Sequence, residues 1–402
     1  MLSGREVYGF EARRNNQGYI IKSVKFFIRV FAIFVLQLCL TNCNRANDVV
    51  RIGVLFPLTG DASGYGEKGK KAIELAVDDV NSSGGIHGRK VVAIFEDSRA
   101  DSRIGVTAAQ RLISINKVPA IVGDIVSSVT LPIAPICEKN EVVLIAPTSS
   151  APAITDAGEY IYRVWPSDLA EGSAAGEFAR KKGFKRVAIM HLNNDYGNAI
   201  AEVFEKSYTG GDASVVVSIS YTPDDTSFQS SLSRIRSLNA DAIYLAGYYA
   251  DIARILKQAK ELGINAQFIG VTALEDSEFL KIAGDAAEGV VYPLATGFDP
   301  VNGAEESKIF AQNFSKRFNY EPGWVESHCY DAFMLIAHGL KSSKAMTGSD
   351  VKSFLDNMGV YKGVTGDVVF DANGDVVKPV RFKIVKGCKF EELDLGEQVF
   401  CE

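Results

Sequence analysis

The amino-acid sequence predicts an α/β protein with two lobes, each built around a parallel β-sheet. From Val49 onward, short β-branched runs alternate with stretches of helical period, which is the pattern of βαβ units. These runs form two successive series of four or five strands, more than one doubly wound sheet would comfortably hold. The 402-residue length allows two or three domains at roughly 100–200 residues each, and 47% hydrophobic residues is ordinary for a globular protein.

The first series opens the folded part of the chain. Its predicted strands are VVRIGVLF (49–56), VVAIFE (91–96), AIVG (120–123) and VVLIA (142–146). Between these strands, residues 68–80 and 104–115 carry apolar side chains at helical spacing. Strand and helix therefore alternate, as parallel pairing requires.

The second series follows a turn, RVWPSD, at residues 163–168. Its predicted strands are RVAIMH (186–191), SVVVSI (214–219), AIYLAG (242–247), FIGV (268–271) and GVVY (289–292). Helical stretches such as residues 253–262 separate them, and Tyr244, inside its strand, is predicted to be a core residue.

The last hundred residues differ in character. The Pro, Gly and Asp residues of PLATGFDP (293–300) favour a crossing segment, and two helical patterns follow at residues 305–318 and 326–340. Residues 362–402 contain β-rich runs with Asn-Gly and Lys-Gly turn signals, which predict hairpins rather than βα units.

Residues 1–43 are predicted to be an export signal. Residues 22–29 are basic, residues 30–40 are apolar but for one Gln, and residues 44–48 turn polar. Eleven residues are too few to span a bilayer core, which takes about 20. We therefore expect a periplasmic or otherwise extracytoplasmic protein.

Cysteines leave two questions open. The sequence LTNC at residues 40–43 resembles the bacterial lipoprotein box, which implies a lipidated Cys43, but Asn42 departs from the small residue usual there. Lipid anchoring through Cys43 and secretion as a free protein both stay open. Cys388 and Cys401 could pair in an oxidising compartment, and two free thiols are the alternative.

Charge and motif content exclude several classes of function. The formal charge is −6, but residues 1–43 carry +4, so the remainder of the chain carries −10. This acidic balance argues against nucleic-acid binding, which needs clustered Lys and Arg. Because no CxxC pair is present, a structural zinc site is not expected either.

A dinucleotide-binding motif occurs at residues 64–69, where GYGEKG matches GxGxxG. In a true site the first glycine turns directly off the strand, whereas PLTGDAS intervenes here. We therefore expect these glycines in a loop with Tyr65 projecting as part of a ligand-facing rim, and no cofactor. His191 and His328 are the only tempting catalytic groups, and without a recognisable partner residue they do not predict an enzyme.

Four segments carry a family resemblance over residues 49–385. They are residues 57–91, residues 121–150, AIMHLNNDYGNAI (188–200) and YDAFMLIA (330–337). In order and spacing they resemble the periplasmic branched-chain amino-acid-binding proteins of ABC importers. The resemblance implies the type I periplasmic binding protein fold, with two Rossmann-like lobes, a three-segment hinge, and solute bound between the lobes by hinge closure.

The same resemblance implies domain boundaries. Lobe 1 would comprise residues 49–167 and 297–369, and lobe 2 residues 168–296 and 370–402. The crossing segments would fall near Ser167, Thr296 and Phe370.

The resemblance also implies a carboxylate site in the first lobe. Ser127 stands at the start of a helix after the third strand, and Thr148 and Ser150 follow the fourth. Hydroxyls and free N–H groups at a helix N-terminus suit an anion. The alternative is that Ser127 or Ser128 is only a helix N-cap and residues 148–150 only a turn.

Three aromatic residues and one departure from the family pattern complete the expected site. Tyr65, Tyr196 and Tyr248 match aromatics that close over the ligand in the family. Thr272 stands where amino-acid-binding relatives carry an acid that pairs the ligand ammonium. Either Glu275 or Asp276 replaces it, another acid does, or the ligand is an organic or aromatic carboxylate without an amine.

By resemblance, then, the chain is expected to be a monomeric solute-binding protein. It would capture a small amino acid, branched-chain or related, and deliver it to an ABC permease in the cytoplasmic membrane. A ligand-presenting sensor is the alternative within the binding class. No nucleic-acid partner is expected.

Overall fold

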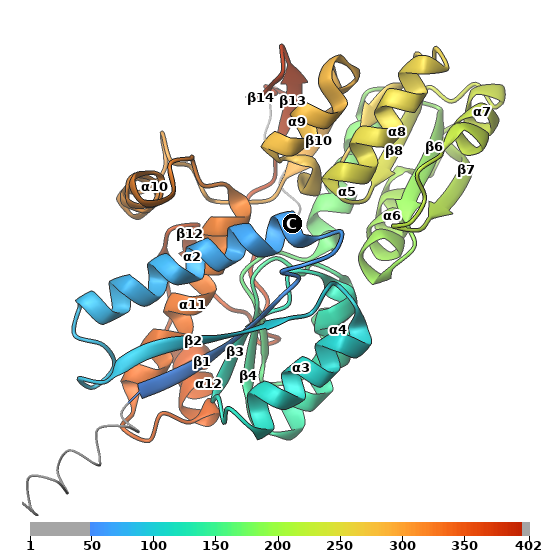
Figure 1. The fold of residues 1–402 in the computed structure, drawn as a ribbon. Helices are drawn as coiled ribbons and strands as arrows, with labels where there is room; N and C mark the ends of the chain where they lie inside the picture. The colour runs from blue at the N-terminus through green and yellow to red at the C-terminus, as the bar shows by residue number, and fades with distance from the viewer. Residues whose placement is uncertain (1–48, 396–402) are drawn as a thin grey trace, which may run out of the picture. The chain divides into compact units, whose positions relative to one another are not determined.

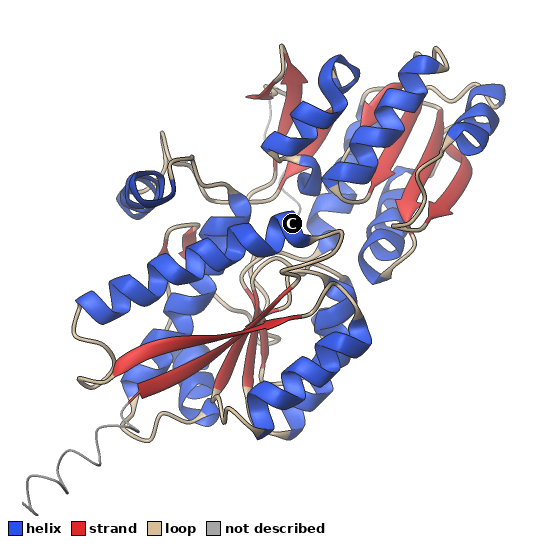
Figure 2. Ribbon diagram, in the orientation of Figure 1, coloured by secondary structure: helices blue, strands red, loops and turns tan. Residues whose placement is uncertain are grey.

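A computed structural model describes residues 49–395, which form two large β-sheets with helices packed on their faces (Figures 1 and 2). The first sheet has five strands in the order β2-β1-β3-β4-β5, and the second has seven in the order β14-β13-β10-β9-β8-β6-β7. A separate two-stranded sheet pairs β11 with β12. The fold class is therefore α/β with parallel-sheet cores, as predicted.

The strands are β1 (Val49–Phe56), β2 (Lys90–Asp97), β3 (Ala120–Gly123), β4 (Val143–Ala146), β5 (Ile161–Arg163), β6 (Arg186–Leu192), β7 (Ser214–Tyr221), β8 (Ala242–Ala246), β9 (Gln267–Ile269), β10 (Val291–Leu294), β11 (Tyr361–Gly363), β12 (Gly366–Val368), β13 (Arg381–Lys386) and β14 (Lys389–Glu392).

The helices are α2 (Ser63–Ser82), α3 (Ser102–Ser114), α4 (Ser127–Lys139), α5 (Asp168–Lys181), α6 (Asp195–Tyr208), α7 (Gln229–Ser237), α8 (Tyr249–Glu261), α9 (Ser277–Ala283), α10 (Glu305–Phe318), α11 (Trp324–Ser342) and α12 (Gly348–Asn357), with short 3-10 helices η2 (Pro152–Ile154), η3 (Thr272–Leu274) and η4 (Gly284–Ala287). None of them, within residues 49–395, is both long and apolar enough to cross a membrane.

The first sheet is buried on both faces. Helices α3 and α4 pack together on one face, and α2 packs with α11 on the other (Figure 1). Strands β3 and β4 are accordingly apolar and fully buried, as AIVG and VLIA. Central strands of parallel sheets are expected to read this way, because helices cover both of their faces.

The second sheet reverses its direction of growth at β6. From β6 the chain passes outward through α6 to β7, then returns through α7 to β8 on the other side of β6 and continues to β9 and β10. Right-handed crossovers therefore put α6 on one face and α7 and α8 on the other. Strand β13 extends this sheet antiparallel to β10.

Three connections carry the chain between the elements of the two large sheets. After β5 it enters the seven-stranded sheet, after β10 it returns to helices α11 and α12, which pack on β3 and β4, and after β12 it rejoins the seven-stranded sheet at β13. The expected crossings near Ser167, Thr296 and Phe370 lie in these three connections. The division into two lobes with the boundaries given above stays a prediction.

The prediction of a loop at the GYGEKG segment was wrong, although Tyr65 does line a pocket. Helix α2 begins at Ser63, so the three glycines lie in its first two turns rather than in a loop. A Cβ at Gly66 would overlap the carbonyl oxygen of Pro57, and one at Gly69 would lie 2.9 Å from the Phe56 ring. The glycines therefore let the helix pack closely on the end of β1, which explains the motif without a phosphate.

The other differences between the predicted elements and the structure are confined to single strands and turns. Strand β10 lies two residues beyond the predicted one, and the three-residue strand β5 was not predicted. The Lys-Gly signal does make a hairpin, in which Gly387 and Cys388 both have positive φ, as a two-residue turn between β13 and β14 requires. The Asn373-Gly374 turn instead joins strands of different sheets.

Three predictions concern residues outside the described ones. The export signal of residues 1–43, lipidation at Cys43 and the pairing of Cys388 with Cys401 stay predictions. Cys388 itself is exposed.

Candidate functional site

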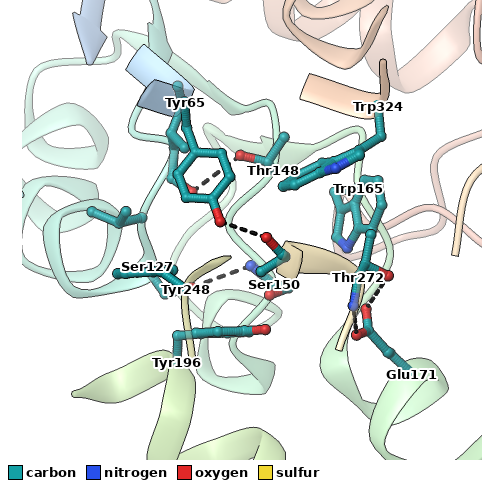
Figure 3. Close-up of a pocket in the computed structure, with 13 residues that line it drawn as sticks. Tyr65, Ser127, Thr148, Ser150, Trp165, Glu171, Tyr196, Tyr248, Thr272 and Trp324 are labelled. Atoms are coloured by element: carbon teal, nitrogen blue, oxygen red, sulfur yellow. Dashed lines mark hydrogen bonds between the residues drawn. The ribbon is translucent and has the colours of Figure 1, made fainter. Parts of the chain in front are cut away.

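One pocket brings together all seven residues that the sequence singled out (Figure 3). It is lined by Tyr65, Ser127, Thr148, Ser150, Tyr196, Tyr248 and Thr272, together with Ile125, Val126, Trp165, Glu171, Ala273 and Trp324. The seven come from segments that follow β1, β3 and β4 of one sheet and β6, β8 and β9 of the other. Open α/β sheets bind ligands at the carboxyl ends of their strands, so this is the expected place for a site.

Hydroxyl groups form one end of the pocket. Ser127 is the first residue of α4, and its Oγ accepts the N–H groups of Ser150 and Ala151, each at 3.2 Å. Its hydroxyl hydrogen therefore remains available to a ligand. Thr148 Oγ1 lies 3.1 Å from the carbonyl oxygen of Ile125 and donates to it.

The simpler interpretation of Ser127 as a helix N-cap was wrong. Val126 occupies the N-cap position of α4, and no side chain caps this helix. Asp124 Oδ1 accepts the N–H of Val126 at 2.8 Å, but no side chain of the N-cap residue accepts an N–H of the first turn. The positive end of the helix dipole faces the pocket, which favours an anion there.

Arg163 fixes the loop that carries Ser150. The side chain is fully buried at the end of β5, and its Nη1 donates to the carbonyl oxygens of Ser150 (3.2 Å) and Ala151 (3.0 Å). Its Nη2 donates to Thr155 Oγ1 at 2.7 Å and pairs with Asp375. The loop is thus held from one side by Ser127 and from the other by a buried guanidinium.

Aromatic rings form a continuous wall. Ring centroids of Tyr196 and Tyr248 are 6.0 Å apart, those of Tyr248 and Tyr65 5.8 Å, those of Tyr65 and Trp324 5.7 Å, and those of Trp324 and Trp165 5.1 Å. Trp165 and Trp324 are the only two tryptophans of the chain, and sequence reasoning missed both. Their rarity, and the position of Trp165 in a predicted turn, were the available signals. Such a wall suits an apolar ligand group.

Tyr65 links segments that follow β8 and β9. Its hydroxyl donates to the carbonyl oxygen of Ala273 at 2.6 Å and accepts the N–H of Tyr249 at 3.2 Å. Burial raises the pKa of this phenol well above its usual range, so the hydroxyl stays a donor.

The opposite end of the pocket holds an acid that the sequence did not predict. Glu171, on the first turn of α5, is only 3% exposed. Its Oε1 accepts the N–H of Thr272 at 2.7 Å, and its Oε2 lies 2.9 Å from Thr272 Oγ1. Burial raises the pKa of Glu171 to about 7, although these hydrogen bonds oppose the shift.

The two acids proposed to replace Thr272 are engaged elsewhere. Glu275 pairs with Lys383 at 2.7 Å and accepts the hydroxyl of Tyr292. Asp276 pairs with Lys68 at 2.6 Å and caps α9. Neither lines the pocket, so Glu171 is the acid that does.

The histidines do not contribute to this site. His328 is fully buried against Trp165, and desolvation lowers its pKa to about 3. His191 does not line the pocket. Within residues 49–395, no cluster of His, Cys, Asp and Glu has the makeup of a metal site.

Comparison with known proteins shows that the chain is similar to periplasmic binding proteins. Residues 49–389 match the family model described as periplasmic binding protein. A Pseudomonas aeruginosa relative, named leucine-, isoleucine-, valine-, threonine- and alanine-binding protein, is 29% identical over 335 residues, which cover 82% of this chain and 88% of the relative.

Solved structures resemble the chain over a similar span. A leucine-binding protein from Thermotoga maritima has a TM-score of 0.80 at 29% identity, covering 86% of this chain and 98% of its own. The substrate-binding protein of a branched-chain amino acid transporter from Streptococcus pneumoniae, in complex with isoleucine, has a TM-score of 0.79 at 27% identity, covering 85% and 98%.

Proposed function

The chain belongs to the periplasmic binding protein family, and from this premise we propose that it captures a small apolar amino acid outside the cytoplasmic membrane. The family is one of binding proteins rather than enzymes. In this proposal the protein is monomeric and delivers its ligand to an ABC permease. The relatives named for branched-chain amino acids support the ligand class.

The observation that carries the proposal is the division of one pocket into a hydroxyl end and an aromatic wall. Ser127, Ser150 and the N-terminus of α4 offer donors to a ligand carboxylate. The rings of Tyr65, Trp165 and Trp324 offer apolar area to an aliphatic side chain. An amino acid with an apolar side chain has both groups.

Hinge closure is part of the proposal, with lobe 1 at residues 49–167 and 297–369 and lobe 2 at residues 168–296 and 370–402. Several contacts join residues of the two proposed lobes, and three of them lie beside the pocket. These three are Tyr65 Oη with Ala273 O, Lys68 with Asp276, and Trp324 Nε1 with Glu275 O at 3.2 Å. Such contacts would form on closure and stabilise the ligand-bound state.

Titration calorimetry of the purified protein with leucine, isoleucine, valine, threonine and alanine tests the function. We expect saturable binding, and we expect Ser127→Ala to weaken it about 10- to 100-fold, because a hydrogen bond to a charged carboxylate is lost. Ser128→Ala is the matched control, since its hydroxyl does not line the pocket. Absence of binding by all five amino acids in the wild type would refute the proposal.

Tyr65→Phe tests the contribution of closure. The variant keeps the ring in the aromatic wall but removes the hydroxyl that joins Ala273 and Tyr249. We expect ligand affinity to fall about 2- to 10-fold, the value of one ordinary hydrogen bond. Tyr160→Phe, away from the pocket, should leave the affinity unchanged. Equal affinity in Tyr65→Phe and the wild type would argue against a closing role.

A further inference from the structure

The pocket contains a buried carboxylate that has no cation beside it. Glu171 lines the pocket, and among residues 49–395 no Lys, Arg or His forms an ion pair with it. The groups that face it add no positive charge, since they are Asp168 one turn earlier on α5, Tyr196 on α6 and Tyr244 on β8. Burying a carboxylate without a countercharge costs free energy, so this geometry favours a cationic group on the ligand.

The carboxylate is also held in a fixed orientation. Thr272 donates its backbone N–H to one oxygen, and its hydroxyl, which lies 2.9 Å both from the other oxygen and from the carbonyl oxygen of Pro293, contacts the second. Each oxygen of an ionised carboxylate can accept more than one hydrogen bond, so acceptor capacity remains. Figure 3 shows Glu171 and Thr272 on the other side of the pocket from Ser127.

We propose that Glu171 receives the α-ammonium group of the ligand, with Thr272 as its positioning residue. Glu171 thereby makes the pocket select amino acids over carboxylic acids of the same skeleton. This inference rests on the proposed function, and it accounts for the threonine at position 272, because the acid is supplied from α5 instead.

A purely structural role for Glu171 makes a different prediction. If the carboxylate only supported Thr272, its loss would weaken ligands with and without an amine to the same extent. The glutamine of Glu171→Gln keeps the shape and one acceptor oxygen but loses the charge. A pair of ligands that differ only in the amine therefore separates the two roles.

Calorimetry with leucine and 4-methylpentanoate, which is leucine without its amine, provides that pair. In Glu171→Gln we expect leucine affinity to fall roughly 30-fold or more, the effect of removing one partner of a buried charge pair. We expect the affinity for 4-methylpentanoate to stay equal or to increase. Glu177→Gln, on the same helix but outside the pocket, should change neither affinity.

The outcomes distinguish the two proposals. If the wild type binds none of the amino acids, the proposed function fails. If the wild type binds leucine but Glu171→Gln keeps the wild-type ratio of leucine to 4-methylpentanoate affinity, only the present inference fails. Thermal unfolding of each variant checks that the protein remains folded.

A pH series gives a second readout. Burial raises the pKa of Glu171 to about 7. An ammonium binds the ionised form, so leucine affinity should be full above that pH and fall by up to about tenfold per unit as pH decreases below it. This dependence should be lost in Glu171→Gln and kept in Asp168→Asn, which removes the neighbouring carboxyl. A flat leucine affinity across this range in the wild type would overturn the inference.

Discussion

Replacing Arg163 with methionine is expected to lower the free energy of unfolding by about 3–5 kcal/mol, the usual cost of breaking a buried ion pair. The guanidinium is fully buried and bonds two carbonyl oxygens, one hydroxyl and the carboxylate of Asp375. Methionine fills a similar volume but leaves all four acceptors without that donor. Because two of them belong to Ser150 and Ala151, ligand affinity should fall as well.

Urea unfolding followed by circular dichroism measures the free energy of unfolding, and titration calorimetry measures the ligand affinity. Arg163→Lys should show an intermediate loss, since lysine keeps the charge but not the planar fork of donors. Arg180→Met, exposed on α5, is the matched control and should change stability by less than about 0.5 kcal/mol. A loss below about 1 kcal/mol in Arg163→Met would contradict the expectation.

Asp331→Ala is expected to lower the free energy of unfolding by about 3–5 kcal/mol, because a buried hydrogen-bond network loses its central acceptor. The carboxylate of Asp331, on α11, accepts the N–H groups of Val364 and Thr365 at 2.9 Å and the Thr365 hydroxyl at 2.6 Å. Lys378 Nζ in turn donates to the carbonyl oxygen of Thr365 at 3.0 Å. The substitution would leave two buried N–H groups and a buried ammonium poorly compensated.

The same unfolding experiment tests this prediction. Asp367→Ala is the matched control, since Asp367 lies on the adjacent hairpin and makes an exposed pair with Lys362 at 2.7 Å. Exposed pairs contribute about 0–1 kcal/mol, so the control should remain close to the wild type. Equal stability of the two variants would show that the Asp331 network does not hold the hairpin to α11.

Hydrophobic periodicity predicted most of the regular structure because it reports which faces of an element are buried. Strands β1 and β3 and helix α10 have the predicted bounds. The three-residue strand β5 was too short to show a period. The start of α2 was missed because its glycines are poor helix formers, and only their close packing on β1 explains them.

Hydrophobic periodicity in the sequence determined the α/β architecture, and resemblance to a known family singled out seven pocket residues. Six of the seven stand within about four residues of the end of a parallel strand, where open α/β sheets bind ligands, whereas Tyr65 lies on α2. Their part in ligand binding remains the proposal made above.

Tertiary structure alone decided the partners. Glu171 and Thr272 are 101 residues apart in sequence, and Arg163 and Asp375 are 212 apart. Periodicity says that a side chain is buried but not which distant group it meets. Charge buried without local compensation can be recognised only when the packing is known, and here that packing places an acid of α5 in the pocket.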